Sequence, residues 1–157
     1  MSKKLSYENL GEPDLKIAGL QLWVHGRQFP DAEDEYDGNW LRVTAHSGGS
    51  GASVWVHGAI LMVTDIARFG NECAAMLQGD SESATLESPE PELKVTLKAS
   101  DGLGHIRVEV EITPDRLFQA HWFEFEVDQS HLPELIRKCA RIVLDYPIRG
   151  LQGRESV

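Results

Sequence analysis

The sequence predicts an α+β domain with a mainly antiparallel, curved β-sheet of six to seven strands and two amphipathic helices, in the order β-β-β-α-β-β-β-β-α. Three observations lead to this prediction. Several short segments alternate apolar and polar residues, as strands with one buried face do. Two longer segments carry apolar residues at helical spacing. Turn-forming residues separate neighbouring strand segments, which is typical of antiparallel hairpins.

A single domain is expected for a chain of 157 residues. Apolar periodicity places this domain at residues 15–148, between flexible segments at residues 1–14 and 149–157. The chain shows neither a signal-peptide core nor an apolar run long enough to cross a membrane. Cys73 and Cys139 fall on the apolar stripes of the two predicted helices, which indicates buried thiols in a reducing compartment. We therefore expect a cytoplasmic protein.

The formal net charge of −10 sets limits on the partners of this protein. Such a surface repels phosphate backbones, and no cluster of Lys and Arg offsets it, so nucleic-acid binding is not expected. The same charge keeps a protein soluble and favours its encounter with a basic partner.

Three strands are expected in the first part of the chain. Leu15–Arg27 is interpreted as one strand, with Gly19 at a bulge where the apolar residues change face. Residues 40–47 and 52–58 form the next two strands, and the glycine-rich turn between them predicts a hairpin.

A helix and a second group of strands follow. The first helix is predicted over residues 64–78 and a short strand over residues 83–87. Residues 92–99 and 104–113 alternate most clearly, and they predict a hairpin whose cross-strand Lys and Glu pairs stabilise its register.

The last strand and the last helix lie between Phe118 and Tyr146. The apolar residues change face between Trp122 and Phe123, which predicts a β-bulge or a strand buried on both faces. The helix is expected to begin after Ser130, which can cap its free amides, and to end before Pro147.

Tryptophan and histidine are expected to share the outer face of the first three strands. The motif W-V-H-G occurs at residues 23–26 and again at residues 55–58, and its Trp and His have outward parity on their strands. The ring side chains predicted on this face are Trp23, His25, Trp40, His46, Trp55 and His57. They suit a small ligand, a partner protein or a second copy of the chain. Zinc would need histidine nitrogens within about 2.1 Å of one ion, and no close H-x-x-x-H or C-x-x-C spacing supports that, so no metal is predicted.

An acidic loop is predicted between the first two strands, at residues 29–39. Its acidic residues are Asp31, Glu33, Asp34, Glu35 and Asp37. The glycine and the terminal glutamate of a calcium-binding EF-hand loop are missing from this segment. The loop is either a solvated connection or a patch that meets a basic partner.

Catalytic motifs are not found in the sequence. There is neither a G-x-S-x-G nucleophile motif nor a phosphate-binding loop. The carboxylates of Glu124, Glu126 and Asp128 are expected on a solvated strand face rather than in an acid–base pair. We predict no enzymatic activity and no cofactor.

Three segments together resemble the small bacterial WapI-type immunity proteins. They are Y-D-G-N-W at residues 36–40, E-P-E-L at residues 90–93, and F-x-F-x-x-D-Q-S-x-L at residues 123–132. The resemblance covers residues 15–148 and departs at His131, where an aromatic residue is expected. It implies a cytosolic, non-enzymatic protein that binds and neutralises the toxin domain of a contact-dependent system.

Three hypotheses follow. In the first, the chain is an immunity protein that binds a basic toxin domain through Asp31, Glu33, Asp34, Glu35, Asp37, Trp40 and Trp55. In the second, it is a ligand- or metal-binding domain that uses Trp23, His25, His46 and His57. In the third, it is a homodimeric structural domain whose tryptophan face meets a second copy.

Overall fold

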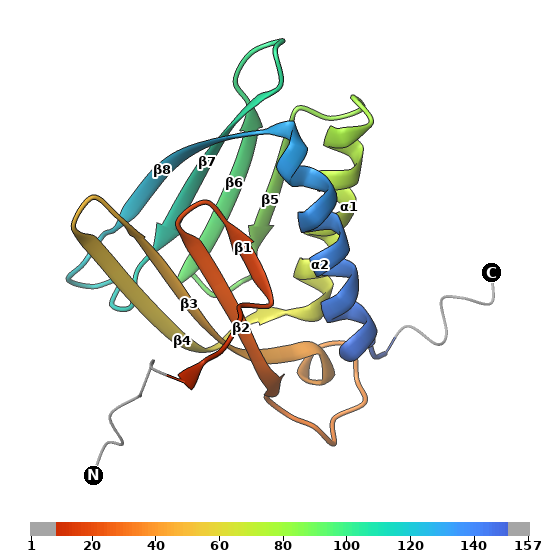
Figure 1. Cartoon of the computed structure of the whole chain (residues 1–157). Helices are drawn as coiled ribbons and strands as arrows, with labels where there is room; N and C mark the ends of the chain where they lie inside the picture. Colours follow the sequence, from red (N-terminus) through yellow and green to blue (C-terminus); the bar gives the residue numbers. More distant parts are fainter. Residues whose placement is uncertain (1–8, 151–157) are drawn as a thin grey trace.

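Two four-stranded antiparallel sheets and two helices make up the described part of the chain, residues 9–150 of the computed structural model (Figure 1). The first sheet contains β1 (Leu15–Ile17), β2 (Leu20–Arg27), β3 (Trp40–Gly49) and β4 (Ala52–Met62). The second contains β5 (Ser83–Glu87), β6 (Leu93–Ala99), β7 (His105–Ile112) and β8 (Trp122–Asp128). The helices are α1 (Val63–Leu77) and α2 (Leu132–Asp145), and short 3-10 turns lie at η2 (Asp37–Asn39) and η3 (Gln129–His131).

The prediction of an antiparallel α+β fold is confirmed, but the prediction of one sheet of six to seven strands is wrong. The strands form two sheets of four, and the order is four strands, a helix, four strands and a helix. Helix α1 leads from β4, at an edge of the first sheet, to β5, at an edge of the second. Alternation shows which side of each strand is buried, but it does not show which strands pair with each other.

The expected first strand is in fact a hairpin. β1 and β2 pair through Ile17 and Leu20 around a tight turn at Ala18 and Gly19. The apolar residues change face there because the chain reverses, and not because a bulge interrupts one strand. The bulge of this region lies further along, between Val24 and Gly26.

The start of β8 also differs from the expectation. Its register with β7 is regular from Asp128 back to Trp122, so there is no bulge at the predicted place. Phe118 belongs to the connection that precedes the strand, and Trp122 lies on the same outer face as Glu124. The change of parity therefore marks the place where the strand begins.

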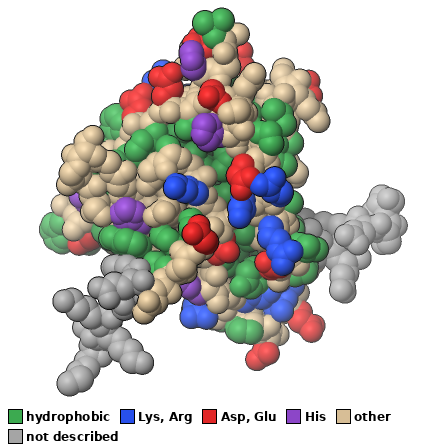
Figure 2. All heavy atoms as spheres, viewed as in Figure 1, with side chains coloured by type: hydrophobic (Ala, Val, Ile, Leu, Met, Phe, Trp, Pro, Cys, Tyr) green, Lys and Arg blue, Asp and Glu red, His purple; other side chains and the backbone are tan. Residues whose placement is uncertain are grey.

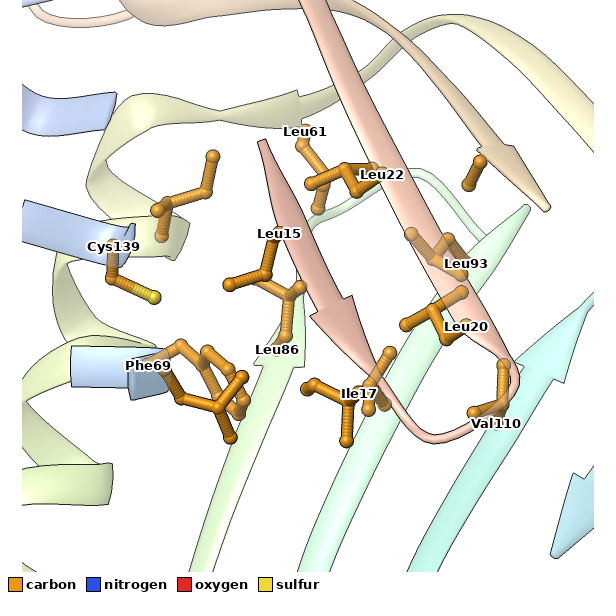
Figure 3. Close-up of a cluster of buried hydrophobic side chains, with 14 of the residues drawn as sticks. Leu15, Ile17, Leu20, Leu22, Leu61, Phe69, Leu86, Leu93, Val110 and Cys139 are labelled. Atoms are coloured by element: carbon orange, nitrogen blue, oxygen red, sulfur yellow. The ribbon is translucent and has the colours of Figure 1, made fainter. Parts of the chain in front are cut away.

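The hydrophobic core fills the space between the two sheets and beneath the helices. In Figure 3, Leu20 and Leu22 from β2 lie across from Leu93 of β6 and Val110 of β7, and Phe69 reaches in from α1. All of these side chains are buried. The helices lie side by side along one flank of this core, with α1 against β5 and α2 against β1 (Figure 1).

The two cysteines are buried, as the sequence predicts. Burial raises the pKa of both Cys73 and Cys139 to about 12, so their thiols stay protonated and unreactive. Cys139 also packs closely against α1, because a Cβ atom on Gly70 would lie 2.9 Å from the Cβ of Cys139. The thiols therefore serve packing. Neither helix in the described part of the chain has the length and apolar character that crossing a bilayer requires.

An exposed ion pair closes the turn between β6 and β7. Nδ1 of His105 lies 2.6 Å from Oδ2 of Asp101. The hydrogen bond and the charge of Asp101 raise the pKa of His105 above 6.5, and the hydrogen bond from His105 lowers the pKa of Asp101 below 3.8. The pair therefore favours the folded state between the ordinary pKa values of the two groups, and this contribution is lost as the pH rises through the raised pKa of His105.

We expect His105→Ala to lower the melting temperature more at pH 5.5 than at pH 8.5, because only the protonated imidazole gains from Asp101. Thermal unfolding at the two pH values, followed by circular dichroism, measures the difference. His57→Ala is the matched control, since the exposed His57 forms no ion pair within residues 9–150. Equal shifts for His105→Ala at both pH values would contradict this account.

Candidate protein-binding surfaces

The acidic loop (residues 28–39) connects β2 to β3 at one end of the molecule (Figure 1). All five acidic side chains predicted for it are exposed: Asp31, Glu33, Asp34, Glu35 and Asp37. Figure 2 shows acidic side chains protruding at this end of the molecule. The loop thus presents negative charge to solvent between Asp31 and Asp37.

One carboxylate shapes the loop from within. Oδ2 of Asp34 accepts hydrogen bonds from the backbone N–H groups of Asp37 at 2.9 Å and Tyr36 at 3.2 Å. These bonds, with that from Asp37 the strongest, lower the pKa of Asp34, so its charge persists at neutral pH. Asp34 combines a structural role with a surface charge.

Buried Asn39 ties the acidic loop to the segment that follows α2. Its Nδ2 donates to the backbone oxygens of Glu35 at 2.6 Å and Arg149 at 3.0 Å. Its Oδ1 accepts a hydrogen bond from the backbone N–H of Arg149 at 2.9 Å. The side chain is 0% exposed, so these hydrogen bonds are made without competition from water.

Two arginines complete the attachment. Nη1 of Arg149, at the start of the segment predicted to be a flexible tail, donates to the backbone oxygens of Pro30 and Ala32, both at 2.7 Å. Arg27 donates from Nη1 to the backbone oxygen of Gly38 at 2.6 Å, and partial burial lowers its pKa. The backbone of the acidic loop is therefore held at several points, while its acidic side chains are exposed to solvent.

Trp40 is not a surface residue, so the prediction that it faces outward is wrong. Only 7% of Trp40 is exposed, because the acidic loop folds back over the start of β3. Tyr36 covers it in an edge-to-face contact with 6.1 Å between the ring centroids, and Tyr36 itself is 58% exposed. The most exposed aromatic side chain of the acidic loop is thus Tyr36, which the sequence argument did not select.

The predicted Trp/His face is assembled on the first sheet. Trp23 and Trp55 stack with 5.9 Å between their ring centroids. The ring centroid of His46 lies 4.2 Å from that of Trp55. Only 6% of Trp23 is exposed, and its indole N–H donates to the backbone oxygen of Gly11 at 3.0 Å. Burial lowers the pKa of His46, which favours its neutral form. The rings mainly cover one another, so this face resembles a small outer core more than an open binding site.

The histidines of this face are engaged with hydroxyl groups. Nε2 of His25 lies 2.7 Å from Oγ1 of Thr44, and Nε2 of His46 lies 2.7 Å from Oγ of Ser53. His57 lies opposite Thr44 on the neighbouring strand and is exposed. Within residues 9–150, no group of three or more His, Cys, Asp or Glu side chains is arranged to hold a metal ion.

An exposed apolar segment (residues 117–122) lies between β7 and β8, where sequence reasoning expected a buried strand. Leu117 and Phe118 are each 86% exposed and Trp122 is 65% exposed. The Pro114-Asp115 turn, followed by residues without regular alternation, was the available indication that the strand begins only at Trp122.

Comparison with known proteins identifies one family. The family model described as "Immunity protein WapI-like family" matches residues 14–147. No curated protein has a significant sequence match to this chain.

Several solved structures share a distant likeness. One chain comes from the Trypanosoma bruciei MRP1/MRP2 crystal structures; it is 16% identical, with 82% of this chain and 76% of that chain covered and a TM-score of 0.44. Another comes from the CdiA-CT/CdiI toxin and immunity complex of Enterobacter cloacae. It is 11% identical, 78% of this chain and 99% of that chain are covered, and the TM-score is 0.43. A third belongs to a guide-RNA-binding protein complex bound to a guide RNA. It is 17% identical, 81% of this chain and 90% of that chain are covered, and the TM-score is 0.42. Likenesses at this level do not inform on function.

Proposed function

Since the chain belongs to the immunity protein WapI-like family, we propose that it is a non-enzymatic protein-binding domain that neutralises a bacterial toxin domain through its acidic loop. The family match over residues 14–147 confirms the resemblance found in the sequence motifs. The observation that carries the proposal is the acidic loop itself, with exposed carboxylates on a backbone fixed by Arg27, Asn39 and Arg149.

Charge supports this proposal in two ways. The formal net charge of −10 attracts a basic partner over a distance, which raises the rate of encounter. The hydrogen bonds of Asn39 and Arg149 hold the loop in place before binding, so little conformational entropy is lost when a partner docks. A toxin domain with a basic surface is the partner that this arrangement suits.

A charge-reversal variant tests the proposal. We expect Asp31→Lys with Glu33→Lys to lower the association rate constant with the toxin domain encoded at the same locus about 10-fold or more at low salt. These two carboxylates are exposed, and replacing them leaves Asp34 to shape the loop. Stopped-flow or surface-plasmon measurements at several salt concentrations, with a catalytically inactive toxin domain, provide the rate constants.

The matched control carries the same change in net charge at the other end of the molecule. Asp80 and Glu82 are exposed residues of the α1–β5 connection, which lies far from the acidic loop (Figure 1). Asp80→Lys with Glu82→Lys is expected to slow association by less than about twofold to threefold, through net charge alone. Equal slowing by both variants would contradict a role for the loop. Lack of binding by the wild-type protein, or a locus without a toxin gene, would contradict the proposed function itself.

A further inference from the structure

We propose that the exposed apolar segment (residues 117–122) is a second contact with the same partner, and that its side chains enter an apolar pocket on the basic toxin domain. This inference rests on the proposed function and assigns different kinetic roles to two surfaces of the protein. The acidic loop speeds association with the partner, and the apolar segment slows dissociation of the complex.

The exposure of this segment is the first argument. The exposed fractions of Leu117, Phe118 and Trp122 are 86%, 86% and 65%. Among the large apolar side chains of the described residues, only Leu103 and Leu144 are comparably exposed. Single exposed apolar residues are common on protein surfaces, but three within one short segment mark a contact site. Aromatic residues of this size are also the ones that dominate binding energy at protein interfaces.

The second argument is that the segment is held in place by its own hydrogen bonds. The carboxylate of Asp115 accepts from the backbone N–H of Leu117 at 3.0 Å, and its backbone oxygen accepts from the N–H of Gln119 at 2.9 Å. Oγ1 of Thr113, a buried residue, accepts from the backbone N–H of His121 at 3.2 Å. The apolar side chains are therefore displayed by an ordered connection, and docking them requires little further ordering.

Charged residues of both signs surround the segment, because Arg116 directly precedes it and Lys94 lies opposite Glu111 in the register of β6 and β7. Glu111 lies opposite Trp122 in the register of β7 and β8, and Glu109 lies opposite Glu124. Glu124 pairs with Arg107 at 3.3 Å, whereas Glu111 forms no ion pair within residues 9–150. An apolar centre beside the unpaired Glu111 fits a partner whose apolar pocket has a Lys or Arg at its edge.

The same surface continues to the acidic loop. A depression of about 450 Å³ is lined by Glu35 and Tyr36 of that loop together with Glu87 at the end of β5. A second depression of about 530 Å³ is lined by Glu87, Glu111 and Trp122 together with Lys94 and Lys98. Glu87 belongs to both, so a partner that meets the acidic loop can extend across the outer face of the second sheet to Trp122.

The test measures dissociation and association separately. We expect Phe118→Ala with Trp122→Ala to raise the dissociation rate constant of the complex with the inactive toxin domain by about 10²-fold, because buried aromatic anchors act mainly on dissociation. The association rate constant should stay within about twofold of the wild-type value, since no charge is changed. The acidic-loop variant Asp31→Lys with Glu33→Lys should show the opposite pattern.

The control is Leu144→Ala, which removes a 69% exposed apolar side chain from α2 and should leave both rate constants unchanged. Thermal unfolding of each variant shows that the fold persists. If the wild-type protein binds the toxin domain but the Phe118 and Trp122 variant dissociates at the wild-type rate, this inference fails while the proposed function stands. If sedimentation shows a wild-type dimer that the same variant dissociates, the occupant is a second copy of the chain and the inference is overturned.

Discussion

The Phe69→Ala variant is expected to unfold with a free energy about 3–5 kcal/mol lower than that of the wild-type protein. Phe69 is fully buried and extends from α1 into the core near Cys139 of α2 and Leu86 of β5 (Figure 3). Alanine leaves a cavity that close-packed neighbours from three elements can fill only in part. Urea unfolding followed by circular dichroism measures the change.

The comparison variant is Leu77→Ala on the same helix, where the leucine is 44% exposed and about 1 kcal/mol or less is expected. Because small domains are stable by only about 5–15 kcal/mol, the Phe69 variant should lose much of its stability. A loss as small as that of the Leu77 variant would show that the core collapses around the missing ring.

The second large effect is expected for Asn39→Ala, at about 2–3 kcal/mol. This change removes the hydrogen bonds of the Asn39 side chain to the Arg149 N–H and to the carbonyl oxygens of Glu35 and Arg149. These backbone groups lose their hydrogen-bond partner at a site that is buried in the native protein. We expect faster amide hydrogen exchange at residues 35–39, measured by NMR, together with the lower unfolding free energy. Weaker toxin binding should accompany it, because the acidic loop then has to be ordered on binding.

The control for Asn39→Ala is Asp31→Ala, a change in an exposed residue of the same loop that should alter stability by no more than about 0.5 kcal/mol. Unchanged amide exchange in the Asn39 variant would mean that Arg27 and Arg149 hold the loop without it.

Local patterns in the sequence predicted those elements whose partners are close in the chain. The β6–β7 hairpin appears almost at the predicted residues, because both strands alternate strictly and a short turn joins them. The β1–β2 turn was missed because Ala18 takes a φ of 51°, a conformation rarely expected of alanine. The division into two sheets could not be predicted, since the pairing of strands depends on contacts between distant segments.

The candidate site shows the same limit. The charge and exposure of the acidic loop follow from its composition, and the structure agrees with both. The attachment of Asn39 to Arg149 spans 110 residues of sequence, and neither residue belongs to a recognisable motif for it. The burial of Trp40 and the exposure of Phe118 were missed for a related reason, because parity along a strand says nothing about loops that cover it or about where the strand begins.

The attachment of the acidic loop to Arg149 has a consequence for biosynthesis. A ribosome adds about 5–20 residues per second, so the 110 residues from Asn39 to Arg149 take about 5–20 s to follow. During that time the acidic loop has left the ribosome without the hydrogen bonds that hold it. A nascent chain therefore lacks the finished acidic surface, and the acidic loop reaches its final form only after the last helix and Arg149 have been released.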